Sequence, residues 1–134
     1  MTEIHHPHTL RVYWEDTDAG GVVFYANYLK FFERARTEWL RSAGIEQSVL
    51  KEHTGAIFVV ADVHIRYVAS AKLDDVLTIT AKVLELGKAS LRMEQKAWRG
   101  DSLLAEGTVR VGCVDAQTLK PRRMPELVLQ ALGC

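Results

Sequence analysis

The chain has 134 residues, and its 17 basic and 17 acidic side chains cancel to a formal net charge of zero at pH 7. Without excess positive charge, a broad surface for nucleic acid or for an anionic membrane is not expected, so any anionic ligand must be bound by a local cluster of charge. A hydrophobic fraction of 48% and a charged fraction of 25% are typical of a soluble globular domain. The length fits one core, and we take residues 1–134 as a single domain.

The sequence predicts neither a targeting segment nor a membrane span. No N-terminal stretch joins a basic start to the apolar core of a signal peptide, and no apolar run approaches the ~20 residues of a spanning helix. Cys113 and Cys134 are too few for a disulfide framework and are expected to be reduced thiols, which predicts a cytoplasmic protein. Residues 1–8, with histidines around Pro7, predict a flexible tail rather than a metal site.

A short strand and a long helix are predicted in the first third of the chain. Residues 9–15 alternate between apolar and polar side chains, as in a half-buried strand. From about Phe24 to Ala43, apolar side chains recur at three- and four-residue steps, which predicts an amphipathic helix about 30 Å long. Gly44 is a suitable residue just past its end. The linker 45–55 has room for one helical turn, and no other long helix is predicted.

From residue 57 onward the apolar pattern has a period of two, which predicts strands. Polar or glycine-containing turns separate four runs, at 57–67, 77–83, 91–97 and 103–113. Together with the first strand they predict an α+β fold, in which a five-stranded antiparallel sheet wraps around one long central helix. We expect the last four strands to form a meander. The open sheet edges predict a homo-oligomer, a dimer or tetramer, built by edge pairing.

The segment WEDTDAGGVVFYANY at 14–28 holds three acidic residues, Glu15, Asp16 and Asp18, within four positions just before the predicted helix. Acidic residues in this place are common as helix N-caps, and paired glycines are common in loops, so a purely structural role stays open. Glycines 20–21 also permit backbone conformations and close approaches that other residues do not.

The same segment suits hydrolysis of an activated acyl group. A carboxylate can act as a nucleophile or as a general base toward water. Unpaired backbone N–H groups at the helix start, near Tyr25, can stabilise a developing oxyanion. This chemistry requires neither a metal ion nor a cofactor.

The run from Arg11 to Leu40 closely resembles the hotdog-fold 4-hydroxybenzoyl-CoA thioesterase-like family, and the likeness continues through YVASA at 67–71 and LDD at 73–75 to CVD at 113–115 and KPR at 120–122. It covers nearly the whole chain. Within the family the best match is the branch of acyl-CoA thioesterases associated with the Tol-Pal cell-envelope system. The resemblance implies a hotdog fold and hydrolysis of the thioester of an acyl-CoA or of acyl carrier protein.

The resemblance also implies roles for residues of the motif. The second aspartate is catalytic in the family, which assigns catalysis to Asp18 and leaves Asp16 as a structural loop carboxylate. Tyr25 stands where many members of the Tol-Pal branch carry histidine. Because a phenol with an ordinary pKa of about 10 is no base at neutral pH, Tyr25 is expected to position the substrate. Gly21 is expected to let the backbone approach the substrate.

Further substrate contacts are expected outside the motif. Lys88 and Ser90 follow a turn at Gly87, in a stretch that resembles the family's ligand-side hairpin, and a phosphate of coenzyme A would suit them. A solvated surface role for both remains open. Glu33 lies on the predicted helix, where some hotdog thioesterases use a glutamate. With Asp18 present, we expect Glu33 to be a surface or supporting residue.

Two other functions remain possible from the sequence. The Tol-Pal resemblance also suits an adaptor that binds acyl carrier protein and phospholipid-synthesis enzymes near the inner membrane, with incidental hydrolysis. A hotdog dehydratase is disfavoured, because its site usually pairs a histidine with an acid on the helix, and residues 24–27 contain no histidine.

Overall fold

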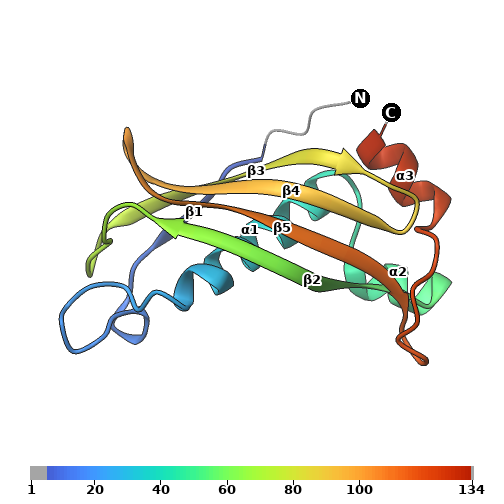
Figure 1. The fold of residues 1–134 in the computed structure, drawn as a ribbon, viewed down its shortest axis with the longest axis horizontal. Helices are drawn as coiled ribbons and strands as arrows, with labels where there is room; N and C mark the ends of the chain where they lie inside the picture. The colour runs from blue at the N-terminus through green and yellow to red at the C-terminus, as the bar shows by residue number, and fades with distance from the viewer. Residues whose placement is uncertain (1–5, 134) are drawn as a thin grey trace.

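The computed structural model describes residues 6–133, which form one curved sheet with helices (Figure 1). The sheet is five-stranded, with strand order β1-β3-β4-β5-β2. Helix α1 (Asn27–Ser42) lies against one of its faces, as expected for the α+β hotdog architecture, which is confirmed. The strands are β1 (His8–Arg11), β2 (Ala56–Tyr67), β3 (Val76–Leu86), β4 (Ser90–Arg99) and β5 (Ser102–Asp115).

The strand order differs from the expected meander of the last four strands. Strands β3, β4 and β5 are sequential neighbours, but β2 pairs with β5, from Ala56 opposite Asp115 to Tyr67 opposite Ala105. After β2, which lies at one edge of the sheet, the chain therefore crosses toward the opposite edge, where β3 lies next to β1. Apolar alternation gives the length of a strand and its buried face, but it does not specify the neighbour. As a result β2 is an edge strand.

The first strand is shorter than expected, and it begins earlier. His8, which we expected in the tail, pairs with Ile79 as the first residue of β1, because strand pairing uses backbone groups whatever the side chain. The chain leaves the sheet after Arg11 and makes a 3₁₀ turn at Trp14–Asp16. Trp14 is consequently 79% exposed instead of half-buried. Residues 1–5 of the expected tail lie outside the described residues.

The helices also differ from the expectation in extent. Helix α1 begins at Asn27 and ends at Ser42, and Gly44, two residues further on, has a φ of +87°, the left-handed conformation that glycine favours. The linker holds a two-turn helix, α2 (Gln47–Thr54), and the C-terminus forms α3 (Glu126–Gly133), which was not predicted. None of the described helices is long and apolar enough to cross a membrane.

The core is divided into two clusters along α1. The loop-side cluster lies where α1 begins and contains Val12, Val23, Tyr28, Phe31 and Leu77, among others. The far cluster lies toward the end of α1, at α2 and α3 (Figure 1). Its members include Trp39, Leu50, Met124, Val128 and Leu132. The loop-side cluster therefore supports the segment that carries the motif.

Candidate active site

The motif forms a tight loop between β1 and α1. Thr17 and Val23 face each other in an isolated antiparallel bridge, and the Asp18 N–H donates to the Val22 carbonyl at 2.9 Å. Gly21 has a φ of +82°, a conformation that other residues rarely adopt. A side chain at Gly20 would place its Cβ 3.2 Å from Oδ1 of Asp18. Gly21 is thus explained by its backbone conformation and Gly20 by the nearby carboxylate of Asp18, and substrate binding by Gly21 stays a prediction.

The carboxylate of Asp18 is exposed at the turn of this loop. Its Oδ1 accepts a hydrogen bond from the Gly20 N–H at 2.8 Å, which fixes the side chain relative to the loop. Among residues 6–133, its Oδ2 has no hydrogen-bond partner. A carboxylate that is held by one oxygen and open at the other can meet an incoming group, as a nucleophile or general base must.

Asp16 has the opposite environment, although it lies only two residues away. It is 8% exposed, and its Oδ2 accepts the Tyr13 N–H at 2.8 Å. Its backbone carbonyl accepts both the Phe24 N–H and the Asn27 side-chain amide. These bonds give Asp16 the structural role that we expected.

The interpretation of the acidic residues as caps of α1 is wrong. The N-cap residue of α1 is Ala26, and no side chain caps the helix there. The Asn27 N–H instead donates to the Phe24 carbonyl at 2.8 Å, and the Tyr28 N–H to the Tyr25 carbonyl at 3.3 Å. Hydrogen bonding of the helix therefore begins at the Phe24 carbonyl, two residues before the N-cap residue Ala26.

Two backbone donors remain free just before α1. Within the described residues, the N–H groups of Tyr25 and Ala26 donate to no acceptor. The carbonyls of Phe24 and Tyr25 point toward α1, where they accept the hydrogen bonds just described. In a planar trans peptide the N–H points in the opposite direction from the C=O. Both N–H groups therefore point away from the helix body. Adjacent free donors of this kind can bind an oxyanion.

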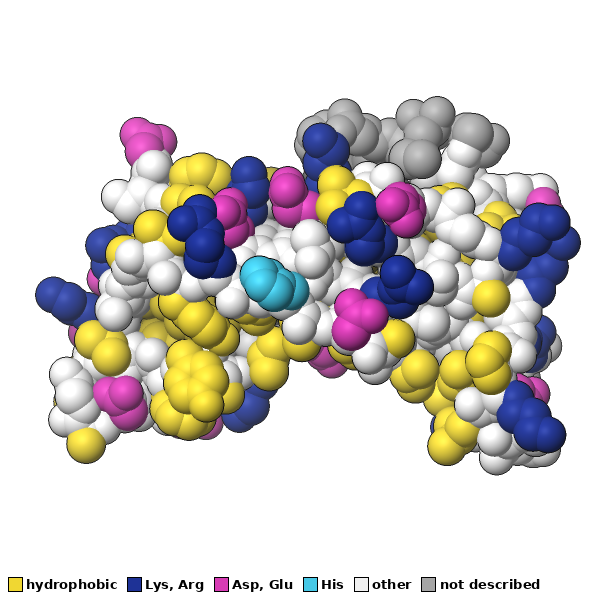
Figure 2. All heavy atoms as spheres, in the orientation of Figure 1, with side chains coloured by type: hydrophobic (Ala, Val, Ile, Leu, Met, Phe, Trp, Pro, Cys, Tyr) yellow, Lys and Arg dark blue, Asp and Glu magenta, His cyan; other side chains and the backbone are white. Residues whose placement is uncertain are grey.

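Exposed aromatic side chains surround these donors. Phe24, Tyr25 and Tyr67 are 44%, 62% and 44% exposed, and Figure 2 shows hydrophobic side chains gathered at this end of the molecule. The rings of Tyr25 and Tyr67 meet edge to face, with centroids 5.9 Å apart. Together with Tyr28 and residues 68–70 they line a hollow of about 170 Å³. Tyr25 is thus available to contact a substrate, and that role stays a prediction.

Lys88 and Ser90 lie far from Asp18 within one chain. The loop of the motif contacts residues 71–72, just before β3, through the Val23 N–H and the Ala71 carbonyl. Lys88 follows the other end of β3, whose 11 residues span on the order of 30 Å, and its carbonyl accepts the Met124 N–H near α3. One chain therefore does not bring Lys88 and Ser90 to Asp18.

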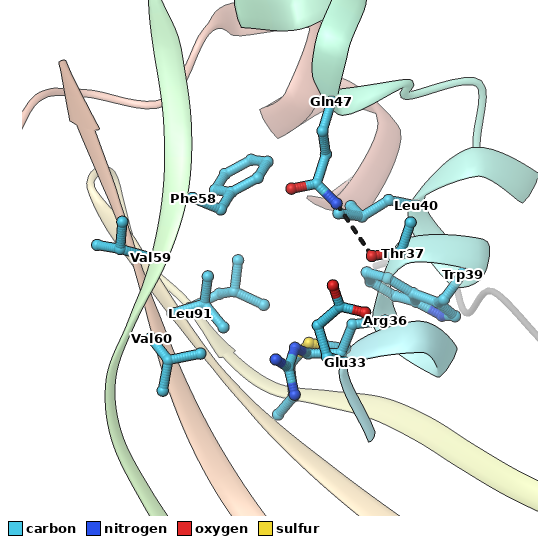
Figure 3. Close-up of a pocket in the computed structure, with 12 residues that line it drawn as sticks. Glu33, Arg36, Thr37, Trp39, Leu40, Gln47, Phe58, Val59, Val60 and Leu91 are labelled. Atoms are coloured by element: carbon cyan, nitrogen blue, oxygen red, sulfur yellow. Dashed lines mark hydrogen bonds between the residues drawn. The ribbon is translucent and has the colours of Figure 1, made fainter. Parts of the chain in front are cut away.

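A separate cavity of about 160 Å³ lies between α1 and the sheet, and sequence reasoning missed it (Figure 3). Its strand side is apolar, with Phe58, Val60 and Leu91, while Glu33 and Arg36 of α1 form a polar side. No sequence pattern predicted it, because its walls come from segments that are distant in the chain.

Arg36 occupies the polar side of this cavity. It donates to Oε1 of Gln95 at 2.9 Å, and the amide of Gln95 donates to the Phe32 carbonyl. Burial lowers the pKa of Arg36, and the nearby Glu33 carboxylate opposes this effect. The cavity lies two to three helical turns from the start of α1, so it can hold an apolar group but not the reacting atoms at Asp18.

Comparisons with known proteins show which family and fold this chain resembles. The family model described as the thioesterase-like superfamily matches residues 12–132. The acyl-CoA thioesterase YbgC of Haemophilus influenzae is 47% identical over 122 residues, which cover 91% of this chain and 90% of that protein. The acyl-CoA thioester hydrolase YbgC of Escherichia coli O6:H1 is 43% identical over 121 residues, covering 90% of each. The crystal structure of a probable thioesterase from Bartonella henselae superposes with a TM-score of 0.85 at 37% identity, covering 90% of this chain and 99% of that one.

Proposed function

This chain belongs to the thioesterase-like superfamily, and we propose that it hydrolyses acyl-CoA thioesters with Asp18 as the catalytic carboxylate. Thioester hydrolysis is the activity of its curated relatives. The observation that supports the choice of Asp18 is its exposed carboxylate, which is carried on the same loop as the two free N–H groups of Tyr25 and Ala26. No feature of the described residues favours the adaptor function.

The reaction needs two contributions from this loop. Asp18 either attacks the thioester carbonyl, expelling the thiolate and forming an anhydride that water then cleaves, or takes a proton from the water that attacks. Both routes consume one water and release a free acid and the coenzyme A thiol. The N–H groups of Tyr25 and Ala26 bind the oxyanion that forms in either route, and one such donor contributes about 2.7–4 kcal/mol in comparable sites.

The acyl group is proposed to extend along α1 into the cavity between α1 and β2. The strand side of this cavity is apolar, and the cavity lies beside the helix whose start carries the donors. We propose a coenzyme A thioester as the substrate, and acyl carrier protein as a second possible carrier. The Tol-Pal association belongs to the same proposal and rests on sequence resemblance alone.

We also propose a homo-oligomer built on the edge strand β2, in the cytoplasm. Val60 and Val63 of β2 are 49% and 42% exposed, and an exposed apolar edge strand is a ready surface for pairing with a second copy. Cys113 is a buried free thiol, which fits a reducing compartment.

The test of the function compares two aspartate variants on a panel of acyl-CoA substrates. Asp18→Asn keeps an oxygen that can accept the Gly20 N–H, so we expect an unchanged Tm and a kcat about 10²–10⁴-fold lower. Asp16→Asn is the matched control: it places the NH₂ group of an amide at a buried position, so we expect it to lower Tm while keeping kcat per folded molecule close to wild type. Wild-type kcat in Asp18→Asn would refute the assignment, and an inactive wild type would refute the function.

A further inference from the structure

Tyr67 is the last residue of β2, and its side chain reaches the first turn of α1. Its hydroxyl donates to the carbonyl of Tyr25 at 3.1 Å. Its ring packs edge to face between Tyr25, at 5.9 Å, and Tyr28, at 5.5 Å between centroids. Because the backbone of Tyr67 is paired with Ala105 of β5, the hydroxyl is held by the sheet and not by the loop.

The Tyr25 carbonyl is the group through which this contact acts. Within residues 6–133, the backbone bond that it accepts is a long one of 3.3 Å from the Tyr28 N–H, and the Tyr67 hydroxyl supplies a second, shorter bond of 3.1 Å. The Tyr25 carbonyl and the Ala26 N–H belong to one planar peptide unit. A bond that holds the carbonyl on one side therefore sets the direction of the N–H on the other.

Resting on the hydrolytic function proposed above, we propose that Tyr67 is a positioning residue, whose hydroxyl holds the Tyr25–Ala26 peptide so that the Ala26 N–H points at the substrate oxyanion. Tyr67 touches neither substrate nor Asp18 in this role. It acts on the transition state, because an oxyanion donor stabilises charge that develops only there.

The Tyr67 hydroxyl can act as a hydrogen-bond donor only while it is protonated. Burial raises the pKa of Tyr67, and the neighbouring Tyr25 raises it further, so its pKa lies above the ordinary value of about 10. The hydroxyl consequently keeps its proton throughout the neutral range. A second hydroxyl of the same cluster, that of Tyr28, has a different task, because it accepts the Ala71 N–H at 3.3 Å and does not touch Tyr25.

The experiment removes each hydroxyl in turn and measures kcat, KM and Tm on one acyl-CoA. In Tyr67→Phe the ring remains, and we expect kcat to fall about tenfold, a part of the 10²–10³-fold loss that follows removal of a whole donor. We expect KM to change less than about twofold and Tm to stay near wild type, because the bond lies at the surface. Tyr28→Phe is the matched control, because it also keeps its ring; we expect a lower Tm and a clearly smaller loss of kcat per folded molecule than in Tyr67→Phe.

Three outcomes would overturn the positioning role. These are a wild-type kcat in Tyr67→Phe, a change confined to KM, and an equal loss of kcat in both phenylalanine variants, which would mark a general effect of the aromatic cluster. Asp18→Asn measured alongside separates this failure from that of the function. If wild type is active and Asp18→Asn is not, the hydrolytic function stands whatever Tyr67→Phe does.

Discussion

At the scale of single residues, Asp16 and Asp18 show how two carboxylates of one loop acquire different environments. The chain turns between them, so Asp16 points inward to the Tyr13 N–H and Asp18 points outward to solvent. Local sequence could not rank the two, because both precede the helix in a run of acidic residues. Only the resemblance distinguished Asp18, and the buried bonds of Asp16 give an independent reason to expect little chemistry from that residue.

Asp75 is a residue whose ionisation stabilises the segment beside the motif loop. Its Oδ2 accepts the Lys72 N–H at 2.8 Å and Nη1 of Arg99 at 2.9 Å. Burial alone raises the pKa of Asp75, but these two donors outweigh burial and leave the pKa below its ordinary value. A carboxyl group with a lower pKa in the folded state adds stability above its unfolded pKa of about 3.9, and this stability is lost as pH falls through the folded pKa.

We therefore expect Asp75→Asn to change the shape of the stability curve. At pH 7 the variant should have a lower Tm than wild type, because the charged bond to Arg99 is absent. As the pH falls below about 4, wild type should lose stability more steeply and the two curves should converge. Thermal unfolding from pH 7 to pH 2.5 measures this. Two curves that stay parallel over the whole range would show that the ionisation of Asp75 does not stabilise the fold.

At the scale of elements, the periodicity of the sequence predicted where each strand begins and ends better than which strands pair with each other. The run 57–67 corresponds closely to β2, yet nothing in its alternation indicated that it pairs with β5. Helix α3 was missed because an eight-residue apolar segment shows too few turns for a period to be recognised. The free N–H groups near Tyr25 were expected from the position of a helix start. The contact of Tyr67 with Tyr25 was not, because it joins residues 42 positions apart.

The edge strand β2 carries the prediction that belongs to this scale. Val63→Lys places a charge on the exposed apolar edge, and we expect it to shift the oligomer toward monomer without unfolding the chain. Val76→Lys is the matched control, because Val76 is also 42% exposed but lies on β3, paired with β1 at the other side of the sheet. Light scattering after size-exclusion chromatography gives the mass of each. An unchanged mass for Val63→Lys, or an equal loss in both variants, would exclude β2 as the pairing edge.

At the scale of the whole molecule, both core clusters stabilise the fold, but only one of them supports the candidate site. The loop-side cluster holds the start of α1 and the motif loop, whereas the far cluster holds α2 and α3 at the other end of the sheet. Both contribute to one folded unit through α1, which packs into each. Damage to either cluster should therefore lower stability, but only damage to the loop-side cluster should move the donors relative to Asp18.

Leu77 and Leu132 provide a matched test of this division. Leu77 is 0% exposed in the loop-side cluster, and Leu132 is 1% exposed in the far cluster. Each Leu→Ala substitution leaves a cavity that costs about 2–5 kcal/mol of unfolding free energy, so both variants should lose on the order of 10 °C in Tm. We expect kcat, measured well below Tm, to fall in Leu77→Ala and to stay near wild type in Leu132→Ala. Equal kcat values in the two variants would show that the clusters do not act separately, and that the geometry at Asp18 depends on the core as a whole.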